Sequence, residues 1–110
     1  MNILNAIGGL VEDLFDPPLR VRYFESEPEP SDVGAKTFAI VGTPKLRKYA
    51  HFRCPCGCGQ VIVLTSNPKV RPRWTLVVDR QRRPTVAPSI WRTTGCGSHF
   101  FVERGRIKWV

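Results

Sequence analysis

Four cysteines constrain this chain more than any other feature of its sequence. Cys54, Cys56 and Cys58 occupy alternate positions in the segment HFRCPCGCGQ, and Cys96 stands much further along the chain in GCG. Alternate residues of an extended strand point to the same face, but three of them spread too far along the strand to share one ion. If these thiols serve one centre, the chain must turn between them.

The residues between these cysteines permit such a turn. Pro55, Gly57 and Gly59 alternate with the thiols, and glycine reaches backbone conformations that are closed to other residues. Zinc prefers four nitrogen or sulfur ligands in a tetrahedron, and a site closed by four thiolates serves structure rather than catalysis. The sequence therefore predicts a structural zinc ion held by Cys54, Cys56, Cys58 and Cys96.

Other arrangements of these side chains remain as alternatives. A disulfide within Cys-x-Cys would be strained, and thiols stay reduced in the cytosol, so a metal is favoured over a disulfide. His99 follows Cys96 by three residues, and His51 precedes Cys54 by three. Either imidazole could replace one thiol, which would give a Cys/Cys/Cys/His site with one cysteine to spare.

A chain of 110 residues has the length of a single domain. Ten prolines and nine glycines favour short elements joined by many turns. The first residues lack the basic segment of a signal peptide, and no apolar run approaches the ~20 residues of a membrane span. These features predict a cytoplasmic protein that does not enter a membrane.

Charge is distributed unevenly along the chain. Residues 1–44 contain three Lys or Arg against seven Asp or Glu, whereas residues 45–110 contain fourteen against two. The basic part attracts an acidic partner, either a protein surface or nucleic acid. Trp74 and Trp91 lie among arginines, as aromatic residues do in single-stranded nucleic-acid binders. No nucleic-acid motif accompanies them, so an acidic protein is the favoured partner.

Two patterns of apolar residues predict the fold class. Residues 2–15 show helical spacing that ends at Asp16-Pro17-Pro18, whereas the remainder alternates as strands do. We therefore expect an α+β fold, mostly antiparallel β, with an N-terminal amphipathic helix (1–18) before a zinc-binding β-rich domain (19–110). Strands are expected at 19–24, 36–42, 46–54, 60–65, 73–79, 85–91, 98–104 and 107–110.

If four thiols hold the metal, His99 is free for other chemistry. Ser89 lies ten residues before it, on what we expect to be a neighbouring strand. A serine nucleophile needs its hydroxyl within about 2.6–3.2 Å of the imidazole, and an acidic residue orients that ring. Asp79 and Glu103 are the only acids of the basic part, and the sequence does not choose between them. His99 as a metal ligand or as a packed residue remains the alternative.

Four short motifs resemble, in the same order, a small bacterial family classed as a domain of unknown function. The motifs are CPCGCG, RWTL, PTVAPSIWR and GCGSHFFVERGRIKW. The resemblance covers roughly residues 50–110. That family is found in operons for ubiquitin-like protein conjugation, beside adenylating and conjugating enzymes.

The resemblance implies a zinc-binding β-rich domain, with the four cysteines and His99 on matching positions, and a role in processing or removing a ubiquitin-like modifier. We expect a peptidase for a ubiquitin-like protein or its conjugates, in which Ser89 attacks the scissile carbonyl and His99 is the base. A metallo form, in which some of the cysteines and His99 hold zinc beside an open water position, suits thiolate-rich ligation less well. The alternative function is a non-catalytic zinc-binding module that recruits an acidic protein or nucleic acid.

Overall fold

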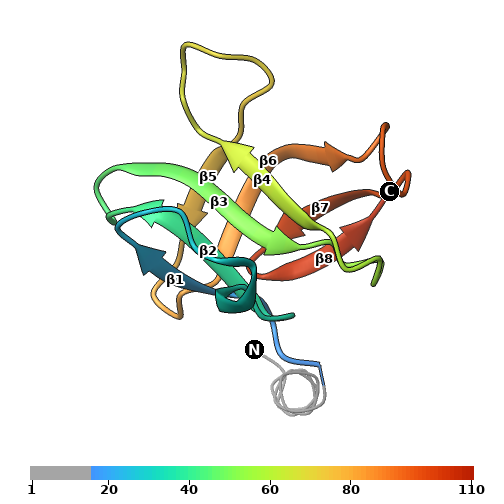
Figure 1. Ribbon diagram of the computed structural model, residues 1–110, viewed down its shortest axis with the longest axis horizontal. Helices are drawn as coiled ribbons and strands as arrows, with labels where there is room; N and C mark the ends of the chain where they lie inside the picture. Colours follow the sequence, from blue (N-terminus) through green and yellow to red (C-terminus); the bar gives the residue numbers. More distant parts are fainter. Residues whose placement is uncertain (1–15) are drawn as a thin grey trace, which may run out of the picture.

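The computed structural model describes residues 16–110, which form eight β-strands in two four-stranded sheets (Figure 1). The first sheet contains β1 (Arg20–Phe24), β2 (Thr37–Gly42), β3 (Arg47–Arg53) and β4 (Val61–Thr65). The second sheet contains β5 (Thr75–Val78), β6 (Pro84–Trp91), β7 (His99–Glu103) and β8 (Arg106–Trp109). Each sheet is built from one continuous stretch of the chain, with its strands in sequence order.

Most neighbouring strands are antiparallel and are joined by short hairpin connections. The exception is the parallel pair of β1 and β2, which needs a longer crossover. The acidic segment 25–36 makes this crossover and contains a 3-10 turn at Pro30–Asp32. The strands predicted from residue alternation are confirmed, and their ends differ from the predicted ones by at most two residues.

The predicted α+β fold class is wrong. Residues 16–110 are a β structure, and their only helical element is the 3-10 turn at Pro30–Asp32. The prediction depended on a helix at 1–18; residues 1–15 lie outside the described residues, and residues 16–18 are not helical. Elsewhere, period-two alternation and frequent turns leave no segment with helical spacing. In the described part of the chain, no helix is long and apolar enough to cross a membrane.

The two sheets pack face to face around a shared aromatic core (Figure 1). Phe38 of β2, Phe52 of β3 and Phe100 of β7 are all fully buried. The ring centroid of Phe52 lies 5.1 Å from that of Phe38 and 6.3 Å from that of Phe100. Phe52 therefore contacts an aromatic ring of its own sheet and one of the opposite sheet, so both sheets depend on one core.

Candidate functional site

The four cysteines meet where one hairpin loop from each sheet comes together. Cys54 directly follows β3, and Cys56 and Cys58 lie in the loop that leads to β4. Cys96 lies in the loop between β6 and β7 of the other sheet. The four sulfur atoms all lie within 4.8 Å of one another. The cluster therefore joins the two sheets at one end of the molecule.

Glycines allow the first cysteine loop to fold back on itself, as the sequence predicts. Gly57 and Gly59 have φ angles of 88° and 82°, values that side-chain-bearing residues rarely adopt. The turn is closed by a hydrogen bond from the Gly57 N–H to the Cys54 carbonyl at 3.2 Å. The Cys58 N–H donates to the Cys56 sulfur at 3.3 Å, so the backbone of the loop also positions this sulfur.

The cysteine cluster fits a zinc ion. Four sulfurs at the usual Zn–S distance of about 2.3 Å form a tetrahedron with edges of about 3.8 Å. The Cys54 sulfur lies 3.4 Å from that of Cys56 and 3.6 Å from that of Cys96. All four thiols are free of disulfide bonds. Both the spacing of the sulfurs and the donor set therefore match a four-thiolate metal site.

The four thiols differ in how readily they ionise. Burial raises the pKa of the Cys54 thiol to about 12. A hydrogen bond with the Ser98 hydroxyl, whose oxygen lies 3.0 Å from the Cys96 sulfur, lowers the pKa of Cys96 to about 6. Metal ligation requires the thiolate form. The Cys96 thiol is already mostly ionised at neutral pH, whereas the Cys54 thiol would have to lose its proton before it could bind a metal. The sequence reasoning missed Ser98, although its position two residues after Cys96 was a usable signal.

Neither histidine belongs to the cysteine cluster among the described residues. His51 is buried within β3, where burial lowers the pKa of its imidazole. His51, which could have replaced one thiol, is therefore a buried residue of its strand and not a member of the cluster. His99 instead faces Ser89, and this leaves all four thiols available for one metal.

Ser89 and His99 lie on neighbouring strands with their side chains in contact. The Ser89 Oγ is 2.9 Å from the His99 Nε2, within the range required for a serine nucleophile and its base. In the register of β6 and β7, Trp91 is opposite His99, so Ser89 and His99 are diagonal neighbours on the same face. Both side chains are partly exposed and can be reached by a substrate.

An irregularity in β6 accompanies this contact. Five residues of β6, from Val86 to Ile90, correspond to only three residues of β7, from Val102 to Phe100. Bulges of this kind redirect side chains and are frequent beside active sites. Trp74 also fixes the backbone here, because its indole N–H donates to the Ser89 carbonyl at 3.3 Å.

The His99 ring is held by a stacking contact. Its ring centroid lies 5.0 Å from that of Trp91, and the two ring planes differ by 10°. The sequence analysis considered Trp91 as a packed residue or as a nucleic-acid stacking residue, and it did not indicate the contact with His99. The alternation of β6 was a usable signal for Trp91, since it follows Ser89 by two residues and so shares its face.

Neither candidate acid orients His99 among residues 16–110. Asp79 lies in the turn between β5 and β6, where its carboxylate accepts hydrogen bonds from the Gln81 and Arg83 N–H groups. Burial alone would raise the pKa of Asp79, but the backbone hydrogen bonds from Arg83 and Gln81 and the nearby Arg104 together lower it, so the carboxylate is ionised and engaged in this turn. Glu103 lies at the opposite end of β7 from His99. The described residues thus provide a serine–histidine pair rather than a triad.

One comparison with known proteins gave a match. A family model described as "Bacterial ubiquitination-like system serine protease (BubE)" matches residues 25–110. The match begins well before residue 50, where the resemblance of the sequence motifs begins, and it includes the whole crossover of the first sheet. No curated protein and no solved structure matches the chain.

Proposed function

The chain belongs to the family of bacterial ubiquitination-like system serine proteases, and on that premise we propose that Ser89 is its nucleophile and His99 its general base. The observation that carries the proposal is the 2.9 Å separation of Ser89 Oγ and His99 Nε2. The family description names a serine protease, and among the described residues this contact is the only hydrogen bond between a serine hydroxyl and a histidine ring.

In the proposed mechanism, Ser89 Oγ attacks the carbonyl carbon of the scissile bond while its proton passes to His99 Nε2. The tetrahedral intermediate expels the amine, which takes that proton from His99, and an ester to Ser89 remains. Water then attacks the ester and gives a proton to His99; the new tetrahedral intermediate expels Ser89 Oγ, which takes that proton back, so that the acid, the free serine and an unprotonated Nε2 result. His99 must therefore begin with Nε2 unprotonated, and the stacked Trp91 ring keeps this nitrogen directed at Ser89.

We further propose that Cys54, Cys56, Cys58 and Cys96 hold a structural zinc ion. Zinc would cross-link the two hairpin loops without contacting the substrate. The loop that carries Cys96 leads directly into β7, whose first residue is His99. The cross-link would therefore hold the strand with the base in register with the strand that carries the nucleophile.

The proposed substrate is a ubiquitin-like protein or its conjugates, as the family description and the excess of basic residues after position 44 both support. The test is to incubate the purified chain with the ubiquitin-like precursor of a related operon and to follow the precursor by intact-mass analysis. We expect loss of a C-terminal fragment with the wild-type chain and no loss with Ser89→Ala. A fluorophosphonate probe, which reacts only with activated serines, should label the wild type and not this variant.

Ser26→Ala is the matched control, because Ser26 is exposed and lies in the crossover, which is neither a cysteine loop nor part of β6. It should cleave and be labelled like the wild type. Metal content and thermal unfolding should be the same in all three proteins. Cleavage that survives Ser89→Ala in folded protein would contradict the proposal.

A further inference from the structure

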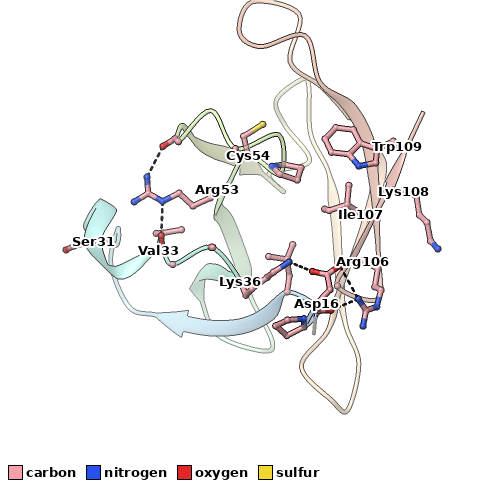
Figure 2. Close-up of a pocket in the computed structure, with 18 residues that line it drawn as sticks. Asp16, Ser31, Val33, Lys36, Arg53, Cys54, Arg106, Ile107, Lys108 and Trp109 are labelled. Carbon is pink, nitrogen blue, oxygen red and sulfur yellow. Dashed lines mark hydrogen bonds and ion pairs between the residues drawn. The ribbon is translucent and has the colours of Figure 1, made fainter. Parts of the chain in front are cut away.

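A groove of about 820 Å³ runs between the two sheets along strand β8 (Figure 2). Ile107 and Trp109 of β8 form one wall, and the segment 33–36 together with Arg53 forms the other. The cysteine loop closes one end of the groove at Cys54. Neither member of the serine–histidine pair lines it, so the groove is separate from the proposed catalytic centre.

Strand β8 presents an unpaired edge to this groove. It is the last strand of its sheet and pairs only with β7. The Val110 N–H donates to the His99 carbonyl at 3.0 Å, and the direction of backbone hydrogen bonds alternates along an antiparallel strand. Ile107 and Trp109 therefore direct their N–H and C=O groups away from β7. Within residues 16–110 these outward groups have no backbone partner.

The charges around the groove are mainly positive. Lys36, Arg53, Arg106 and Lys108 line it with a single acid, Asp16. Lys36 donates to the Asp16 carboxylate at 2.9 Å. In contrast, Arg53 donates to main-chain carbonyls of the crossover and the cysteine loop, so its hydrogen bonds leave its positive charge in place. The groove therefore suits an acidic occupant.

We propose that this groove binds an extended acidic segment of the protein substrate, which adds to the second sheet as a strand beside β8. The identity of the partner rests on the proposed peptidase function. When a peptide adds to a sheet edge, main-chain hydrogen bonds provide affinity and side-chain contacts provide specificity. Here the backbone of Ile107 and Trp109 supplies the main-chain hydrogen bonds, and the basic side chains of the groove supply the specificity.

The register of β8 explains why such a segment would help catalysis. His99 is the first residue of β7, and its carbonyl accepts the hydrogen bond from the Val110 N–H, just beyond the end of β8. A segment that follows β8 from Arg106 towards Trp109 therefore leaves the groove at the end of the sheet where His99 lies. The groove holds the substrate, and residues beyond the bound segment are left free to reach Ser89.

The test uses a fluorescein-labelled ten-residue peptide of alternating Glu and Val, with binding followed by fluorescence anisotropy. A peptide with Lys in place of Glu is the charge control. Ile107→Pro removes one outward N–H but keeps the ladder with β7, because edge strands tolerate proline where the N–H faces away from the sheet. We expect Ile107→Pro to bind the acidic peptide at least tenfold more weakly, and the wild type to bind the Lys peptide at least tenfold more weakly.

Val78→Pro is the matched control for the backbone change. Val78 lies on β5, the other edge of the same sheet, is partly buried against the core like Ile107, and by the same alternation directs its N–H outward. Lys108→Glu should weaken peptide binding, whereas Lys69→Glu, which makes the same charge change outside the groove, should not. With the precursor substrate, Ile107→Pro should raise KM at least tenfold while kcat stays unchanged.

Labelling by the fluorophosphonate separates the two proposals. If the wild type is labelled at Ser89 and Ile107→Pro retains both normal peptide binding and a normal KM, the groove proposal is overturned and the peptidase proposal stands. Equal binding of the Glu and Lys peptides would overturn it as well. The groove proposal would also be overturned if the wild type sedimented as a dimer and Ile107→Pro as a monomer, because a second copy would then cover the edge of β8.

Discussion

At the scale of single residues, the candidate nucleophile is held by contacts with its backbone as well as with its hydroxyl. Trp74 packs against the core and donates its indole N–H to the Ser89 carbonyl. This contact joins the start of β5 to the irregular part of β6. The distance between Ser89 Oγ and His99 Nε2 therefore depends on a residue that takes no part in the chemistry.

We expect Trp74→Phe to slow fluorophosphonate labelling of Ser89 by about two- to tenfold. The phenyl ring keeps most of the packing but removes a hydrogen bond worth about 0.5–1.5 kcal/mol. Trp109→Phe makes the same change at a residue that has no contact with Ser89, and it should leave the labelling rate unaltered. A Trp74→Phe rate equal to that of the wild type would show that the irregular strand holds Ser89 unaided.

The thiols of the metal-free protein should react in a defined order. At pH 7 the Cys96 thiol, whose pKa the Ser98 hydroxyl lowers to about 6, is mostly thiolate. The Cys54 thiol, whose pKa burial raises to about 12, is protonated. Since iodoacetamide attacks thiolates, peptide mapping should show Cys96 alkylated first and Cys54 last.

The alkylation of Cys96 should slow as the pH falls, although Cys96 remains the first thiol to react. Below pH 6 the Cys96 thiolate is lost and its alkylation should slow by about tenfold per pH unit. Zinc added beforehand should protect all four thiols at pH 7. Early alkylation of Cys54 in folded protein would contradict the burial seen here.

The sequence predicted some of the contacts of the cysteine cluster and of the serine–histidine pair, but not all of them. The serine–histidine contact could be predicted because Ser89 and His99 lie on two strands joined by one loop, and the cysteines because their spacing has few other uses. Trp74 could not be predicted in its role, since the loop from residue 66 to residue 73 separates its strand from β4 and alternation does not give its partner. The candidates for the orienting acid were the only two acids of the basic part, but Asp79 lies in the turn after β5 and Glu103 at the end of β7 opposite His99.

At the scale of structural elements, two hairpin loops carry the site. The loop from β3 to β4 and the loop from β6 to β7 meet at the cysteines and also at a hydrogen bond from the Arg92 guanidinium to the Gln60 side chain at 2.8 Å. A metal there would close a long stretch of chain between Cys58 and Cys96. Because the unfolded chain has no preformed metal site, the free energy of metal binding would add to the free energy of unfolding.

We expect Cys96→Ser to lose the metal and to lower the Tm by roughly 10 °C or more. Metal content is measured on the purified variant, and thermal unfolding is followed by circular dichroism. Backbone hydrogen exchange should become faster in both cysteine loops and at the start of β7. If exchange changes only in the loop that contains residue 96, the cysteines of the two sheets do not share one ion.

At the scale of the whole molecule, the sequence predicted the strands but not their arrangement. Alternation marks a strand without naming its neighbour, so the division into two sheets and the parallel pair of β1 and β2 could not be read from it. The fold class was wrong because it depended on the first residues of the chain. The described residues form sheets that share one core, with Phe52 in contact with Phe38 and Phe100.

Because the core is shared, both sheets should unfold in one transition. Trp74, Trp91 and Trp109 all lie on or beside the second sheet, so their fluorescence reports that sheet, whereas far-ultraviolet circular dichroism reports both. Phe52→Leu, a change in the first sheet, should cost about 1–2 kcal/mol and shift the urea midpoints of both signals together. A fluorescence midpoint that stays in place would mean that the sheets unfold separately.

The order of strands in each sheet bears on how a ribosome delivers this protein. Synthesis proceeds from the N-terminus at about 5–20 residues per second, so all four strands of the first sheet emerge before any strand of the second. For the several seconds that separate Phe52 from Phe100, the inner face of the first sheet has no partner. The nascent chain must therefore pass through a stage in which a complete sheet is exposed on its apolar side, and this is the stage at which a chaperone would act.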